Sequence, residues 1–208
     1  MNPEIGEITA QLQRAEEERI PIPPLTLSHP ELSASDAYAI QMEGVRRRLE
    51  SGNKVVGRKI GLTSLAMQQM LAVFEPDYGH LFEDMQIPSG GTVPTSNLIQ
   101  PKIEGEIAFV LKHELSGPGV TPEDVLQATE YVVPALEIID SRIRNWEIKL
   151  TDTVADNGSS ALFVLGAERS GIQGRELSAE RMTLWKNGEV AVTGTGAAVM
   201  GNPVTCVA

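Results

Sequence analysis

Two glutamates separated by one glycine stand out among the residues of this chain that could do chemistry. Glu104 and Glu106 lie in the run Ile103-Glu-Gly-Glu-Ile-Ala-Phe-Val-Leu111, whose remaining residues are apolar apart from the glycine. In a β-strand alternate side chains point to the same face, so the two carboxylates are expected to lie side by side. Two like charges on a largely buried strand require protonation, cationic partners or a hard metal ion.

A third carboxylate lies in a second apolar run, over residues 131–140, where Glu137 is embedded among Val, Leu and Ile. A single glutamate in such a run is more often a solvated strand edge or one half of a salt bridge. Three together favour magnesium, which takes oxygen ligands in octahedral geometry and keeps several waters. Zinc is not indicated, because the three histidines have no paired spacing and the single cysteine completes no motif.

The elements that must position these residues follow from apolar periodicity and from turn residues. Helices are predicted over residues 4–19, 37–49, 64–70 and 122–130, and strands over residues 54–62, 103–111, 131–139, 160–165 and about 182–193. This order predicts an α+β fold with a mixed or antiparallel sheet. We expect an N-terminal helical segment over residues 1–53 and a catalytic domain over residues 54–208.

Composition narrows the classes of function. The chain has 208 residues, of which 41% are hydrophobic, so it is long enough to bury a real core. Its formal charge of -11 argues against a general binder of nucleic acid or anionic membranes, which use clustered Lys and Arg. No apolar stretch reaches membrane-spanning length and no signal peptide is evident, so we expect a cytoplasmic protein.

Five blocks of sequence occur in a fixed order along the chain. They are Gly57-Arg-Lys-Ile-Gly-Leu-Thr-Ser64, Glu75-Pro-Asp-Tyr-Gly-His-Leu81, Pro101-Lys-Ile-Glu-Gly-Glu-Ile-Ala-Phe109, Pro134-Ala-Leu-Glu-Ile-Ile-Asp-Ser-Arg142 and Asp152-Thr-Val-Ala-Asp-Asn157. Together they resemble the hydratase and decarboxylase branch of the fumarylacetoacetate hydrolase superfamily, most closely its 2-hydroxypenta-2,4-dienoate hydratases. The resemblance implies a mixed β-sandwich roll, Mg²⁺ or Mn²⁺ held by Glu104, Glu106 and Glu137, and a homo-oligomer, in this family often a decamer.

The same resemblance implies roles for three further side chains. Lys59 corresponds to a lysine that lines the active site, where an ammonium neutralises a developing enolate or exchanges a proton. Asp77 corresponds to a proton-transferring carboxylate, and Ser160 to a pocket hydroxyl that binds the substrate carboxylate or the attacking water. Without the resemblance, Lys59 would be interpreted as a surface lysine on a strand and Asp77 as a turn residue after proline. Ser160 would be interpreted as a turn residue whose hydroxyl is hydrogen-bonded locally.

The implied reaction is the hydration of 2-hydroxypenta-2,4-dienoate to 4-hydroxy-2-oxopentanoate in the meta-cleavage degradation of aromatic compounds. Two alternatives belong to the same branch: a 4-oxalocrotonate decarboxylase and a 2-oxohept-4-ene-1,7-dioate hydratase. The Gly-Arg-Lys-Ile-Gly block and the Glu-Gly-Glu motif favour a hydratase over the decarboxylase.

A hypothesis of another class is a non-catalytic metal-binding subunit. The partner expected for this chain, besides further copies of itself, is a pathway decarboxylase or aldolase. Members of the resembled family continue beyond the position of Ala208. The C-terminal strands of the roll are therefore expected to be missing from this chain, which would leave an unpaired sheet edge.

Overall fold

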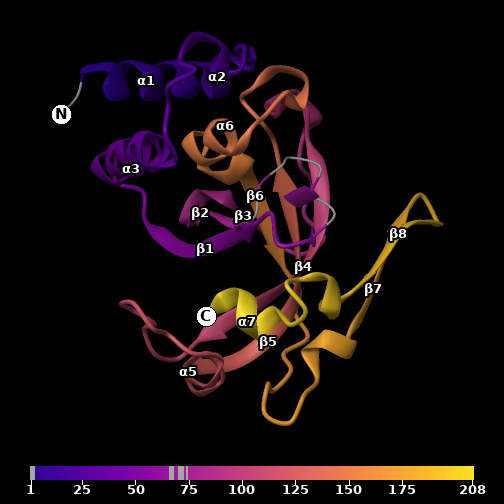
Figure 1. Cartoon of the computed structure of the whole chain (residues 1–208). Coiled ribbons are helices and arrows are strands. Elements are labelled where there is room, and N and C mark those ends of the chain that lie inside the picture. Colours follow the sequence, from indigo (N-terminus) through magenta and orange to yellow (C-terminus); the bar gives the residue numbers. More distant parts are fainter. Residues whose placement is uncertain (1–2, 66–67, 70–72, 74) are drawn as a thin grey trace. The chain divides into compact units, whose positions relative to one another are not determined.

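The computed structural model describes residues 3–65, 68–69, 73 and 75–208 (Figure 1). The chain forms two compact units, which are described separately. The first comprises residues 1–61, 76–104 and 137–163, and the second comprises residues 62–75, 105–136 and 164–208. These units are defined by contacts within the fold. The predicted division into a helical segment over residues 1–53 and a catalytic domain over residues 54–208 concerns function, and it stays a prediction.

Helices of the first unit share one hydrophobic core. Helices α1 (Pro3–Glu18) and α3 (Ala34–Glu50) lie beside each other, and α3 also packs on α6 (Leu150–Ala155) (Figure 1). The short helix α2 (Leu25–Ser28) contacts α6 as well. The buried residues of this core are Ile8, Leu12, Leu25, Ala37, Ile40, Ile143, Val154 and Ala155. The N-terminal helices are therefore stabilised mainly by burial of their apolar faces.

Local sequence signals explain where the principal helices begin. Ser33 caps α3, because its side chain accepts a hydrogen bond from the Asp36 backbone N–H while the Asp36 carboxylate accepts one from the Ser33 N–H. Thr121 and Asp124 form the same reciprocal box at the start of α5, where Pro122 occupies the first turn. Each box satisfies N–H groups that have no partner inside the helix.

The first unit contains an antiparallel pair of strands. Strand β1 (Val55–Gly61) pairs with β2 (Asp77–Phe82), with Lys59 opposite Gly79 and Gly61 opposite Asp77. The strand expected over residues 54–62 is confirmed. The helix expected over residues 64–70 lies partly outside the described residues.

A second sheet has the strand order β3-β6-β5-β4. Its members are β3 (Gln86–Ile87), β6 (Ser160–Leu165), β5 (Thr129–Ile139) and β4 (Lys102–Leu111). The last three correspond to strands predicted from the apolar runs, to within two residues at each end. Because helices and these sheets occur in one chain, the α+β class is confirmed.

The second unit holds the remaining helices and a hairpin. Helix α5 (Pro122–Ala128) and the C-terminal helix α7 (Pro203–Val207) contact each other. The single strand expected over about 182–193 is wrong: β7 (Arg181–Lys186) and β8 (Glu189–Thr195) form an antiparallel hairpin (Figure 1). Its turn is Asn-Gly with positive φ at both residues, a pair that favours tight hairpins.

The second unit has its own core, formed by Val125, Val132, Ile172, Leu177 and Val204. Short 3₁₀ helices connect the elements of both units. They are Glu83–Met85, Thr95–Asn97, Arg144–Trp146, Asn157–Ser159, Leu177–Ala179 and Gly196–Ala198. Within the described residues, no helix combines the length and the apolar character that crossing a bilayer requires.

Candidate active site

Strand pairing brings Lys59 and Asp77 to one face of the β1–β2 pair. Lys59 lies opposite Gly79 and Asp77 lies opposite Gly61, so the two charged residues are diagonal neighbours across the pair. A Cβ atom at Gly61 would overlap the Asp77 carboxylate and lie 3.2 Å from the Lys59 ammonium nitrogen. A Cβ atom at Gly79 would lie 3.2 Å from Lys59 Cδ. Glycine at both partner positions therefore leaves the space that the two charged side chains occupy.

The Lys59 ammonium meets Glu137, a residue 78 positions further along the chain. Lys59 Nζ lies 3.5 Å from Glu137 Oε2, and the two side chains are only 9% and 8% exposed. The same ammonium donates a 2.9 Å hydrogen bond to the Gly158 carbonyl oxygen. Two of the residues singled out from the sequence therefore form a buried ion pair, in which the charge of each offsets the cost of burying the other.

Among the described residues, three buried side-chain oxygens have no hydrogen-bond partner. They are Asp77 Oδ1, Glu137 Oε1 and Ser160 Oγ. Ser160 lies near enough to Glu137 to lower the pKa of that carboxyl, yet its hydroxyl makes no hydrogen bond of ordinary geometry. Buried polar atoms are nearly always paired, so unpaired atoms at one site indicate groups arranged for a ligand. All three atoms belong to residues that the sequence had nominated.

The carboxyl groups of Asp77 and Glu137 both have pKa values above the ordinary range. Burial raises the pKa of Asp77, against the nearby Lys59 charge and a 3.3 Å hydrogen bond from the Thr153 hydroxyl. Burial also raises the pKa of Glu137, where Lys59 opposes the shift and Glu104 adds to it. A raised pKa makes a carboxyl a better proton acceptor than an ordinary surface carboxylate.

Glu104 and Glu106 occupy a different environment from the one that the sequence suggested. Both are exposed, whereas the apolar run had been interpreted as a largely buried strand. Glu104 belongs to the first unit and acts electrostatically on Glu137. Glu106 belongs to the second unit, where burial and the Glu106 charge raise the pKa of Cys206 to about 11. The set of three metal ligands stays a prediction.

Comparisons with known proteins identify the family of this chain. No protein-family model matches the chain. The chain is 49% identical over 205 residues to 2-hydroxypent-2,4-dienoate hydratase of Pseudomonas putida, covering 98% of this chain and 92% of that protein. It is 49% identical over all 208 residues to 2-keto-4-pentenoate hydratase of Paraburkholderia xenovorans, covering 77% of that protein. The chain belongs to the 2-keto-4-pentenoate hydratase family.

Decarboxylases are also among the relatives of this hydratase-family chain. It is 43% identical over 201 residues to 4-oxalocrotonate decarboxylase of Pseudomonas sp. (strain CF600). A solved structure of 4-oxalocrotonate decarboxylase from Pseudomonas putida G7, complexed with magnesium and adipate, superposes with a TM-score of 0.95 at 40% identity. That match covers 99% of this chain and 78% of the decarboxylase. A second structure of the same enzyme is complexed with calcium and acetate.

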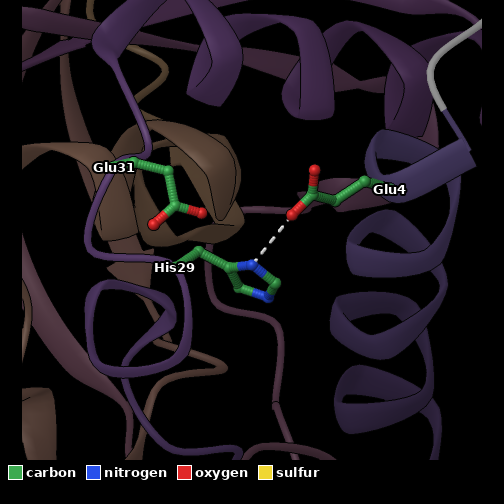
Figure 2. A group of neighbouring side chains, drawn as sticks. All are labelled: Glu4, His29 and Glu31. Atoms are coloured by element: carbon green, nitrogen blue, oxygen red, sulfur yellow. Dashed lines mark hydrogen bonds and ion pairs between the residues drawn. The ribbon is translucent and has the colours of Figure 1, made fainter.

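In the part of the chain that the structure describes, one group of three side chains brings potential metal-ligating atoms close together. Glu4, His29 and Glu31 bring ligand atoms within 4.8 Å of one another (Figure 2). His29 Nδ1 lies 3.0 Å from Glu4 Oε1, and both glutamates are exposed. None of the predicted ligands belongs to this group, and the His29–Glu4 contact is accounted for as a surface pair that links α1 to the residue after α2.

Two buried residues near the site had no role in the sequence interpretation. The Asp140 carboxylate accepts hydrogen bonds from the backbone N–H groups of Ile99 and Gln100, at 2.8 and 2.6 Å, just before β4 begins. The Arg142 guanidinium pairs with the buried Asp156 carboxylate. Both residues lie in the block that ends at Arg142, but their partners become evident only in the folded chain.

Proposed function

We propose that this protein is a metal-dependent hydratase that converts 2-hydroxypenta-2,4-dienoate to 4-hydroxy-2-oxopentanoate in the degradation of aromatic compounds. The observation that carries the proposal is the buried Lys59–Glu137 pair beside unpartnered oxygens of Asp77, Glu137 and Ser160. The site combines an ammonium group, two buried carboxyl groups and a buried hydroxyl. Hydratase relatives at 49% identity support the choice of reaction.

Mg²⁺ or Mn²⁺ fits the donor set. Glu137 presents a buried oxygen without a partner, and an all-carboxylate set suits a hard divalent cation. Glu104, Glu106 and Glu137 would hold the ion. When bound, the cation would act as a Lewis acid that polarises the C2 oxygen of the substrate. The magnesium and calcium in the solved decarboxylase structures support a divalent cation.

The chain's own residues would then handle the protons and the anionic charge. Protonation of the dienol at C5 gives the 2-oxo-3-enoate, water adds at C4, and protonation at C3 completes the product. The Lys59 ammonium would offset the negative charge that develops on the C2 oxygen. Asp77 would hold the transferred proton, and the Ser160 hydroxyl would bind the substrate carboxylate or the attacking water.

Broader features of the protein are part of the same proposal. We expect the fumarylacetoacetate hydrolase type of mixed β-roll, a cytoplasmic homo-oligomer, with a decamer as one form, and a catalytic domain over residues 54–208. Association with a pathway decarboxylase or aldolase would be detected by copurification from cells that express both proteins.

A steady-state assay tests the reaction. The purified chain with Mg²⁺ should consume the dienoate, followed by loss of dienol absorbance, and should lose that activity in EDTA. Glu137→Gln should abolish turnover, whereas Glu83→Gln, at a side chain that is 63% exposed, should leave it unchanged. Turnover that survives both chelation and Glu137→Gln would contradict the metal mechanism.

A 4-oxalocrotonate decarboxylase is the second candidate, since two solved structures that superpose on this chain are of that enzyme. Parallel assays separate the reactions. Carbon dioxide release from 4-oxalocrotonate would identify a decarboxylase, and preference for 2-oxohept-4-ene-1,7-dioate would identify a dicarboxylate hydratase. Metal binding without turnover of any of the three would indicate a non-catalytic subunit.

A further inference from the structure

The segment between α6 and β6 has an uncommon backbone conformation. Asn157, Gly158 and Ser159 have positive φ angles of 57°, 62° and 52°, and two of these residues are not glycine. Such left-handed conformations persist only where surrounding contacts fix them, and they are concentrated at functional sites. The turn leads directly into Ser160, the first residue of β6.

Buried contacts hold both ends of this turn. The Arg142 guanidinium donates hydrogen bonds to the Asp156 carbonyl and, at 3.0 Å, to the Ser160 carbonyl. The backbone N–H of Asp140 donates to the Ser159 carbonyl at 2.8 Å. Arg142 is 5% exposed and Asp156 is 2% exposed, so these contacts are shielded from water. The turn is thus clamped where it begins and where it ends.

The side chain of Asn157 ties the turn to strand β2. Its Oδ1 accepts a 2.7 Å hydrogen bond from the His80 backbone N–H, and its Nδ2 donates a 2.9 Å bond to the His80 carbonyl. The amide therefore pairs with β2 as a neighbouring strand would. The His80 ring is itself fixed, 2.9 Å from Gln41 Oε1, and Gln41 Nε2 donates to the Tyr78 and Val154 carbonyls.

The result of this arrangement is the position of one carbonyl group. The Gly158 carbonyl accepts a 2.9 Å hydrogen bond from Lys59 Nζ, on the same ammonium that lies 3.5 Å from Glu137. A Cβ atom at Gly158 would lie 3.0 Å from Lys59 Cδ, so the lysine stem runs closely against the turn. We propose that Asn157 is a positioning residue: by holding the left-handed turn on β2, it directs the Gly158 carbonyl to the Lys59 ammonium and fixes that ammonium beside Glu137. This inference rests on the proposed catalytic role of Lys59.

Two substitutions at position 157 separate the amide contacts from the backbone conformation. Asn157→Gly removes both hydrogen bonds to His80 while tolerating positive φ. Asn157→Asp keeps the acceptor and removes the donor. Asn187→Gly is the matched control, because Asn187 also has a positive φ, 54°, but lies in the β7–β8 turn. Circular dichroism and thermal unfolding establish which variants fold, and Asn157→Asp carries the test if Asn157→Gly does not.

The kinetic readout is a split between kcat and KM. Asn157→Gly should lower kcat by about ten- to a hundredfold with little change in KM, as expected when a transition-state group is misplaced. Asn157→Asp should lie between that variant and wild type, and Asn187→Gly should match wild type. A rise in KM with unchanged kcat in both Asn157 variants would overturn the proposal.

A second readout does not depend on turnover. Reductive methylation in the presence of EDTA, followed by peptide mass spectrometry, reports the accessibility of each lysine. Lys59 should be modified severalfold faster in the folded Asn157 variants than in wild type, while Lys54, which is 73% exposed, reacts equally in all of them. Unchanged Lys59 labelling overturns the positioning role. Faster labelling in a chain that does not hydrate the dienoate would uphold positioning and refute the proposed reaction, so the two failures are distinguishable.

Discussion

Replacing Lys59 with Met tests how much the ion pair at the centre of the site contributes to the free energy of unfolding. The charged atoms lie 3.5 Å apart and the side chains are 9% and 8% exposed. At an effective dielectric constant of about 20, Coulomb's law gives roughly 5 kcal/mol for unit charges at that distance. Part of this is lost because the stranded Glu137 takes up a proton and because methionine is better suited to burial. Breaking a buried pair typically costs about 3–5 kcal/mol, so we expect Lys59→Met to lower the free energy of unfolding by about 3 kcal/mol.

A double-mutant cycle isolates the pair from other effects of the substitution. Glu137→Gln removes the opposite charge at nearly constant shape, and the double variant should be more stable than the sum of the single effects predicts, by about 2–3 kcal/mol. Lys54 and Glu83 supply the matched control. Their charged atoms lie 3.7 Å apart, but their side chains are 73% and 63% exposed, so a coupling below about 0.5 kcal/mol is expected.

The assay is equilibrium urea denaturation near neutral pH with EDTA present, followed by circular dichroism. Wild type and the three variants of each cycle are measured under the same conditions. Unequal dependence of the unfolding free energy on urea concentration would indicate changes in the unfolded state. A coupling for Lys59 and Glu137 as small as that of the surface pair would refute the reasoning. It would mean that the site does not use burial to strengthen the interaction.

Two further predictions concern residues that line the same part of the first unit. Burial, with help from Arg58, lowers the pKa of His80 from 6.5 to about 4, so protons bind the unfolded chain first as the pH falls. Neutral His80 therefore contributes fully to the free energy of unfolding above about pH 6.5. This contribution is lost as the pH falls towards 4, and the loss reaches about 2 kcal/mol at about pH 5. Urea denaturation of wild type against His80→Asn measures it, and identical pH profiles would contradict it. Gly79→Ala should lower the unfolding free energy by about 1–3 kcal/mol and reduce turnover, because its methyl group would overlap the Asn157 carbonyl. Gly57→Ala, whose nearest neighbour would be 3.7 Å away, is the control, and equal effects of the two substitutions would argue against the steric explanation.

The regular elements could be predicted where a local pattern decides them. Strands β4, β5 and β6 coincide with apolar runs, and α3 and α5 begin at reciprocal capping boxes. The error over residues 182–193 has a local cause as well. The Asn187-Gly188 pair is a strong turn signal inside a strand-like run, and interpreting the run as continuous overlooked it.

The candidate site was only half predictable. Lys59, Asp77 and Glu137 were nominated within sequence blocks and Ser160 just after the last block, and three of these residues carry unpaired buried oxygens in the structure. The burial of Glu104 was misjudged, because alternation shows which side chains share a face but not whether anything covers that face. The contributions of Arg142, Asn157 and the Gly158 carbonyl had no signal of their own in a single sequence.

The sequence by itself determined the types of reactive group and their order, because these depend on residue identity, and its ordered blocks carried the resemblance to the family. Only the tertiary structure decided that Lys59 lies 3.5 Å from Glu137, that a left-handed turn presents the Gly158 carbonyl to its ammonium, and which oxygens lack partners. These properties arise from desolvation and from contacts between residues up to 99 positions apart. Such contacts form when the chain packs, and no local pattern specifies them.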